Sequence, residues 1–169
     1  MSQSSFSITP SKNMTAIFVT FSGRQLGMAT LTFFEFRNFL QENFSKYNQH
    51  FLVDKKTLWY TRGIEDISTN IDETLEYLKQ LTEGYEHVIF IGASMGGYAA
   101  LLYGSLLNVD HVIAFRPQTI ISNELNPAIN LDENPMDLSY YDIRKVINPK
   151  TEYHIYGDSS ITDPNDIHS

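Results

Sequence analysis

Ser94 is the residue whose type and setting most directly suggest chemistry. It lies in the pattern Gly92-Ala-Ser-Met-Gly96, or G-x-S-x-G. Residues 88–91 before it are continuously apolar, as in a strand buried on both faces, and residues 95–107 after it are rich in helix formers. A tight strand-to-helix turn leaves its central hydroxyl projecting, and the two glycines allow strand and helix to pass closely. The pattern predicts a nucleophilic serine, with a purely structural glycine-rich turn as the alternative.

The helix predicted after Ser94 adds a way to stabilise negative charge. Its amino terminus points at the serine, so the backbone N–H of Met95 can stabilise an oxyanion that forms there. With this helix and the preceding strand, the turn resembles the nucleophile elbow of the α/β-hydrolase family. The resemblance covers about residues 14–168. A looser likeness to microbial hydrolases of unspecified substrate rests on residues 90–102 and 112–118.

The resemblance implies an acid and a histidine base after the serine, in that chain order. Asp158 directly follows the last predicted strand and matches the acid position. Asp163 is the alternative acid, although with a proline next to it the residue also reads as a helix N-cap. The histidine that follows the acid is His168. In the family the base usually comes after one more helix and strand, so we expect a truncated chain, with His168 as the alternative base.

Two further groups are expected near the serine. The resemblance implies a second oxyanion N–H from the loop after an early strand, at Gly23 or Arg24. A loop at the carboxyl end of the strand at residues 50–53 carries Trp59, Tyr60 and Arg62, which could line a substrate pocket. The alternative is aromatic packing that holds this loop down. Residues 116–139, rich in proline and polar residues, are either a lid or a plain excursion.

The elements that position these residues alternate along the chain. Strands are predicted at residues 15–21, 50–53, 88–91, 109–115 and 152–156, and helices at about 32–47, 70–81, 95–107 and 140–147. The phenylalanines of residues 33–44 are assigned to the core. This order predicts one α/β domain over residues 1–169, a three-layer α/β/α sandwich with a mostly parallel sheet, α/β-hydrolase-like and short at its C-terminal end. Residues 1–13 form an arm or an edge strand.

Composition excludes several classes of function. The chain has 169 residues, a formal net charge of −8 and 12 scattered Lys and Arg, which argues against a nucleic-acid partner. There is no cysteine, so disulfide and thiolate chemistry are excluded. Without a signal-peptide pattern or a long apolar run, we expect a soluble cytoplasmic protein with no membrane span. No metal site and no cofactor are predicted.

These observations favour a serine hydrolase of esterase type. It would act through an acyl-enzyme on Ser94, with an ester or a related small acyl compound as substrate. Two alternatives remain open: a non-catalytic α/β-hydrolase-like interaction domain, and an acyltransferase that uses the same serine. The acyl group, the leaving group and the oligomeric state are not specified by the sequence.

Overall fold

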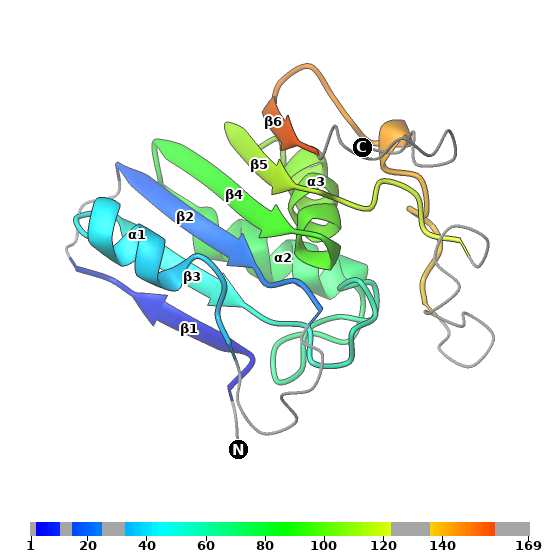
Figure 1. Cartoon of the computed structure of the whole chain (residues 1–169), viewed down its shortest axis with the longest axis horizontal. Coiled ribbons are helices and arrows are strands. Elements are labelled where there is room, and N and C mark those ends of the chain that lie inside the picture. Colours follow the sequence, from blue (N-terminus) through cyan, green and yellow to red (C-terminus); the bar gives the residue numbers. More distant parts are fainter. Residues whose placement is uncertain (1–2, 11–14, 25–32, 123–135, 158–169) are drawn as a thin grey trace.

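The computed structural model describes residues 3–10, 15–24, 33–122 and 136–157. Within these ranges the chain forms one six-stranded sheet with helices packed against it (Figure 1). The elements in chain order are β1 (Ser5–Ile8), β2 (Ala16–Phe21), α1 (Arg37–Asn43), β3 (Asn48–Leu52), α2 (Ile71–Thr82), β4 (His87–Ala93), α3 (Met95–Leu107), β5 (His111–Phe115), the 3₁₀ helix η2 (Ile143–Lys145) and β6 (Glu152–Tyr156).

The sheet has the order β1-β3-β2-β4-β5-β6. All neighbouring strands are parallel except the edge strand β1, which pairs antiparallel with β3. Figure 1 shows α1 on one face of the sheet and α2 and α3 on the other. The α/β class, the mostly parallel sheet and the three layers are therefore confirmed. In such a sheet the carboxyl ends of the parallel strands, where ligands usually bind, share one edge.

Successive side chains of β2 point to opposite faces of the sheet, and both faces are covered. Ile17, Val19 and Phe21 belong to the core between the sheet and helices α2 and α3. Ala16 and Phe18 point to the other face and pack with Leu40 of α1. Because both faces are covered, every residue of β2 is buried.

The predicted helix at residues 32–47 is wrong in its extent. The observed α1 spans only seven residues, from Arg37 to Asn43, and Leu40 is its buried residue. Phe36 before it adopts a left-handed conformation with φ of 64°, which a continuing helix cannot contain. As a consequence Phe33 and Phe39 are 58% and 55% exposed, so their assignment to the core is also wrong.

The predicted helix at residues 140–147 is a single 3₁₀ turn, η2. The Asp142 side chain accepts a hydrogen bond from the N–H of Arg144 at 3.1 Å, a local bond that competes with a longer helix. The Asn148 side chain accepts from the N–H of Lys150 at 2.8 Å and turns the chain towards β6. In the described ranges, no helix has the length and apolar character needed to cross a membrane.

His50 is buried in β3 with both ring nitrogens engaged. Its Nδ1 lies 2.6 Å from Ser7 Oγ and its Nε2 lies 2.8 Å from Tyr77 Oη. Burial lowers the pKa of His50 from 6.5 to about 4, because the charged imidazolium loses its hydration. This histidine links β1, β3 and α2, which is a structural role.

We predict that His50 makes folding stability depend on pH. The unfolded chain protonates His50 near pH 6.5 and the folded chain only near pH 4, so the free energy of unfolding falls as pH is lowered between these values. The fall attributable to His50 is on the order of 3 kcal/mol. Urea denaturation at pH values from 4.5 to 7.5 should show that the free energy of unfolding depends less on pH in His50→Gln than in the wild type. The control His87→Gln changes an exposed histidine and should keep the wild-type dependence; equal slopes in all three proteins would contradict the assignment.

Candidate active site

Ser94 occupies a strained turn at the carboxyl edge of the sheet. It directly follows β4 and is the N-cap of α3, with φ of 51° and ψ of −118°. A non-glycine residue rarely adopts positive φ, and such strain persists only where the surroundings fix it. Here the N–H of Ser94 donates to the Phe115 carbonyl at 2.9 Å, and its own carbonyl accepts from Tyr98 N–H at 3.1 Å. The Ser94 residue is left exposed.

Glycines allow three backbone segments to meet beneath Ser94. A Cβ atom at Gly92 would overlap the backbone of Gly96, and a Cβ at Gly96 would overlap the carbonyl of Phe21. The end of β2, the end of β4 and the start of α3 are therefore in direct backbone contact. The spacing of the two glycines in the sequence corresponds to this close approach.

Gly23 lies beside the Ser94 turn, so the structure brings these two predicted site residues together. A Cβ at Gly23 would lie 3.0 Å from the carbonyl oxygen of Ala93, the residue before the serine. The buried Tyr60 hydroxyl holds this loop in place, because it donates a hydrogen bond to the Ser22 carbonyl at 2.8 Å. The loop after β2 is thus held against the loop after β4.

A carboxylate that the sequence reasoning missed also lies at this point. Gly23 N–H, one of the predicted oxyanion donors, donates to Glu35 Oε2 at 2.9 Å. Ser22 Oγ fixes the segment that carries Glu35, accepting from Glu35 N–H at 3.2 Å and donating to the Phe33 carbonyl at 3.3 Å. Burial raises the pKa of Glu35, and the hydrogen bond from Gly23 opposes that rise. The available signal was a lone carboxylate within Phe33-Phe-Glu-Phe36.

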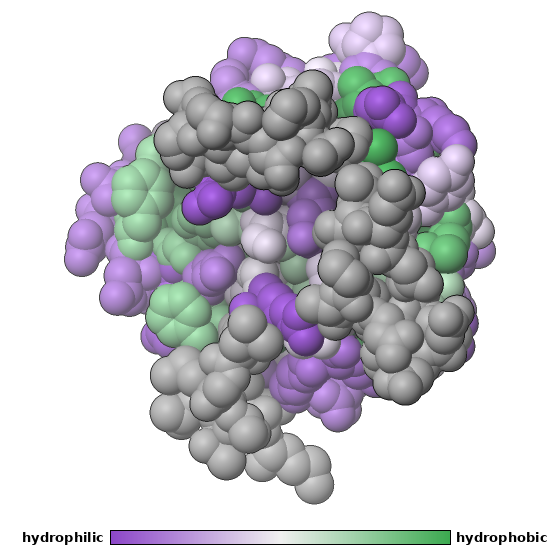
Figure 2. Space-filling view, turned by 45° about the vertical axis from the view of Figure 1, so that its right-hand side comes forward, coloured by the Kyte–Doolittle hydropathy of each residue, from purple (hydrophilic) through white to green (hydrophobic). Residues whose placement is uncertain are grey.

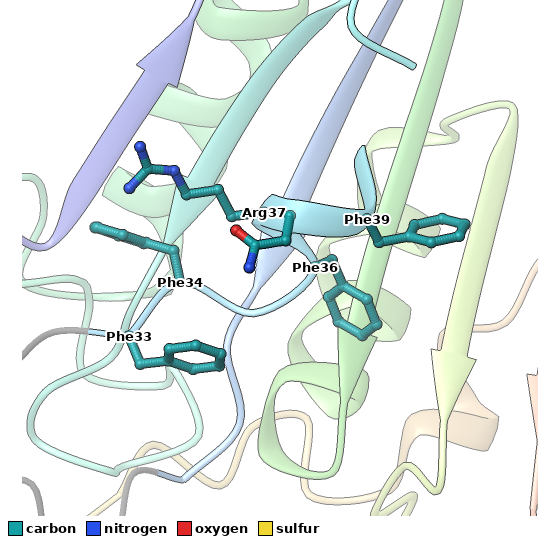
Figure 3. A pocket seen from close by; sticks show the side chains of 6 residues that line it. Phe33, Phe34, Phe36, Arg37 and Phe39 are labelled. Carbon is teal, nitrogen blue, oxygen red and sulfur yellow. The ribbon is translucent and has the colours of Figure 1, made fainter. Parts of the chain in front are cut away.

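The segment around Glu35 opens onto a surface pocket of about 340 Å³. Figure 3 shows its lining side chains, which are Phe33, Phe34, Phe36, Arg37, Asn38 and Phe39. The Phe36 ring stacks on Phe115 at 5.7 Å between centroids, and Phe115 stacks on Tyr156 at 5.1 Å. Since the Phe115 carbonyl also accepts the N–H of Ser94, an aromatic surface adjoins the serine turn.

The three residues predicted to line a pocket, Trp59, Tyr60 and Arg62, differ in burial. Trp59 is 4% exposed and donates through Nε1 to Gln118 Oε1 at 2.7 Å. Tyr60 is fully buried, whereas Arg62 is exposed. Asp54 folds this loop by accepting the N–H groups of residues 56, 58 and 60. Trp59 and Tyr60 thus pack this loop against the core, and a role of the three residues in binding a substrate stays a prediction.

Positive charge flanks the Ser94 turn. Arg24 follows β2 and Arg116 follows β5, and these two strands lie on either side of β4. Both arginines are exposed, and the backbone N–H of Arg116 donates to the Tyr156 carbonyl at 2.6 Å. Figure 2, turned towards this side of the molecule, shows hydrophobic residues at its left and strongly hydrophilic ones beside them. The edge thus combines an exposed hydroxyl with cationic and aromatic groups.

The predicted acid and base lie outside the described residues. This applies to Asp158, Asp163 and His168, and to residues 123–135 of the predicted lid. Among the described histidines, His87 and His111 begin their strands at the opposite edge of the sheet from Ser94. The assignment of a base to Ser94 therefore stays a prediction.

Comparisons with known proteins find similarity at the level of structure. No model of a protein family matches the chain, and no curated protein matches it in sequence. The capsule O-acetyltransferase of Neisseria meningitidis serogroup A superimposes with a TM-score of 0.56 at 14% identity, over 94% of this chain and 85% of that one. Its complex with caged gadolinium gives 0.55 at 15% identity over the same shares. A histidine-to-alanine variant in complex with CoA gives 0.54 at 18% identity, over 75% of this chain and 53% of that one, about half its length. At such identities the likeness shows a shared fold.

We predict that the Ser94 turn does not tolerate a side chain at Gly96. In Gly96→Ala the new Cβ would overlap the Phe21 carbonyl, a backbone atom that cannot rotate away. The free energy of unfolding should fall by about 3 kcal/mol, the upper end of the usual overpacking range. This corresponds to a fall of roughly 6–12 °C in melting temperature. Gly97→Ala is the matched control, because its nearest neighbour is Pro117 Cβ at 3.1 Å and a small shift relieves the contact. Similar melting temperatures for both variants would contradict the close approach.

A second prediction concerns Glu35. Because its pKa in the folded protein is raised above 4.5, the folded state keeps the proton longer than the unfolded state, and stability from this group declines as pH rises above 4.5. Glu35→Gln removes this decline. The melting temperature of Glu35→Gln minus that of the wild type should therefore increase from pH 4 to pH 8, as measured by thermal denaturation. The control is Glu42→Gln, which changes an exposed carboxylate on α1 and should differ from the wild type by the same melting temperature at every pH. A difference that is also independent of pH for Glu35→Gln would refute the assignment.

Proposed function

We propose that this protein is an acyltransferase that carries an acyl group on Ser94 and passes it to a hydroxyl group of a second substrate. The observation that carries the proposal is the placement of Ser94, exposed at positive φ on the turn between β4 and α3. This is the geometry that presents a serine hydroxyl as a nucleophile at a sheet edge. The fold shared with a capsule O-acetyltransferase favours transfer to a hydroxyl over hydrolysis by water.

The reaction proceeds in two steps. Ser94 Oγ attacks the carbonyl carbon of the donor and gives its proton to a base, and collapse of the tetrahedral oxyanion expels the protonated leaving group. The acceptor hydroxyl then attacks the Ser94 ester, loses its proton to the base, and Oγ recovers a proton. His168 with Asp158 or Asp163 is the predicted base and acid. Met95 N–H, with Gly23 or Arg24 N–H, stabilises the oxyanion.

Glu35 determines when Gly23 can take part. Its carboxylate accepts the Gly23 N–H in this structure, so that donor becomes available to an oxyanion only after the Glu35 side chain moves. A carboxylate and a tetrahedral oxyanion both present a negatively charged oxygen to the same N–H. Glu35 therefore occupies, through its Oε2, the hydrogen-bonding position that an oxyanion would take on Gly23 N–H.

A coenzyme A thioester suits the charges at this edge as acyl donor. The phosphates of coenzyme A need cationic partners, and arginine binds phosphate through paired N–H groups. Arg24 and Arg116 follow the strands on either side of the serine strand, although the chain as a whole carries a net charge of −8. The CoA complex of the structural neighbour supports this choice. A neutral ester would not need the arginines.

The proposal is tested by trapping the acyl-enzyme. Incubation with acetyl-CoA followed by intact mass spectrometry should show one acetyl group on the protein, and peptide mapping should place it on Ser94. Ser94→Ala should lose this adduct and also lose labelling by a fluorophosphonate probe. Ser45→Ala, an exposed serine in the turn before β3, should keep both.

Product analysis separates transfer from the two alternatives. With added alcohols or sugars, an acyltransferase forms acetylated acceptor faster than free acetate. Labelling with acetate as the only product, whatever the acceptor, would favour the esterase. An unlabelled wild type would favour a non-catalytic interaction domain.

A further inference from the structure

Two histidines and a glutamate meet on the exposed face of β5 and β6. His111 and Glu152 face each other across the two strands, and His154 is the next residue on the same side of β6. His111 Nδ1 lies 3.4 Å from Glu152 Oε2, and His154 Nε2 lies 3.3 Å from Glu152 Oε1. The two imidazole rings are 5.9 Å apart between centroids and inclined by 29°. The three side chains thus form one compact group.

The spacing of this group matches a tetrahedral metal site. One ligand atom from each residue can be chosen so that all three lie within 4.8 Å of one another. Two ligands at about 2.1 Å from a tetrahedral Zn²⁺ are themselves about 3.4 Å apart. Each imidazole nitrogen already lies near this distance from one of the two Glu152 oxygens, His111 from Oε2 and His154 from Oε1. Two imidazoles and one carboxylate also form a ligand set that zinc sites use, with the fourth position left to water.

The strands hold the three ligands in place. Residues two apart on one strand share a face, which brings Glu152 and His154 to the same side, and the parallel register adds His111 from the neighbouring strand. Their side chains are 39%, 63% and 38% exposed for His111, Glu152 and His154, so an ion can reach them from solvent. Little rearrangement is therefore needed for binding.

We propose that His111, Glu152 and His154 form a Zn²⁺ site that ties the edge strand β6 to β5. The ion binds one nitrogen of each imidazole and the Glu152 carboxylate, and so it links the two strands directly. His111 and Glu152 begin their strands, whereas Ser94 follows the carboxyl end of β4, so the strands separate the two sites by roughly 15 Å. The zinc site lies apart from the Ser94 turn and takes no part in the chemistry there.

Titration of the full chain, free of any affinity tag, with Zn²⁺ tests the proposal. Calorimetry should show one ion bound per chain, and the melting temperature should rise with Zn²⁺ concentration. Co²⁺ in place of Zn²⁺ should give the intense visible absorption of a tetrahedral site. Binding should weaken as the buffer is acidified, because protons compete for the imidazoles.

The variants decide which residues bind. His111→Ala, His154→Ala and Glu152→Gln should each weaken Zn²⁺ binding at least tenfold, since loss of a supporting partner alone costs 10–100-fold. His87→Ala, at the start of β4 and outside the cluster, should bind like wild type. Fluorophosphonate labelling of Ser94 should be the same in all four variants, which makes the test independent of the proposed acyl transfer. Absence of one-to-one binding, or equal loss in His87→Ala, would overturn the proposal and leave the cluster as three side chains packed on the surface of the sheet.

Discussion

The candidate site depends on the backbone contact between Gly96 and Phe21. Because there is no side chain at Gly96, the amino terminus of α3 can rest on the last residue of β2. This contact brings the loop after β2, with Gly23, against the loop after β4, with Ser94. It also leaves Ser94 at positive φ, where the hydrogen bond from its N–H to the Phe115 carbonyl fixes it. Three strands therefore contribute to the turn, and the helix dipole of α3 points into it.

The sequence predicted this part of the fold well because each signal was local. A continuous apolar run at residues 88–91 marked β4, and a strand was also predicted at residues 15–21, where β2 is buried along its whole length. The glycines at 92 and 96 stand where the strand and helix pass, and the alternation of strands and helices indicated a parallel sheet. The close approach of Gly23 to Ala93 followed from topology, since β2 and β4 are neighbours in the sheet.

The phenylalanine-rich segment could not be predicted in the same way. Its spacing fits a helical face, but Phe36 turns left-handed and the helix starts only at Arg37. The reason is tertiary: Ser22 Oγ binds the backbone of residues 33 and 35, and Gly23 binds the Glu35 carboxylate, so the segment is fixed to the end of β2 in a non-helical conformation. These partners are about twelve residues away in sequence, and no local pattern shows them. Phe33 and Phe39 are exposed in this conformation, and both line the surface pocket of the segment.

The histidines show that residue type alone does not determine role. His50 and His111 both lie in strands, β3 and β5, yet their surroundings differ. His50 faces α2, is 4% exposed and is kept neutral by burial. His111 is partly exposed on the surface of β5. There it lies beside the Glu152 carboxylate and the His154 imidazole. The difference arises from the neighbouring strand, because the register of β6 against β5 decides which side chains stand opposite His111. A one-residue shift of that register would turn Glu152 and His154 to the other face and disperse the group.

The same register places the Tyr156 carbonyl on the N–H of Arg116, at the serine edge. Correct pairing of the last strand therefore supports the arginine beside Ser94 at one end and assembles the histidine–carboxylate cluster at the other.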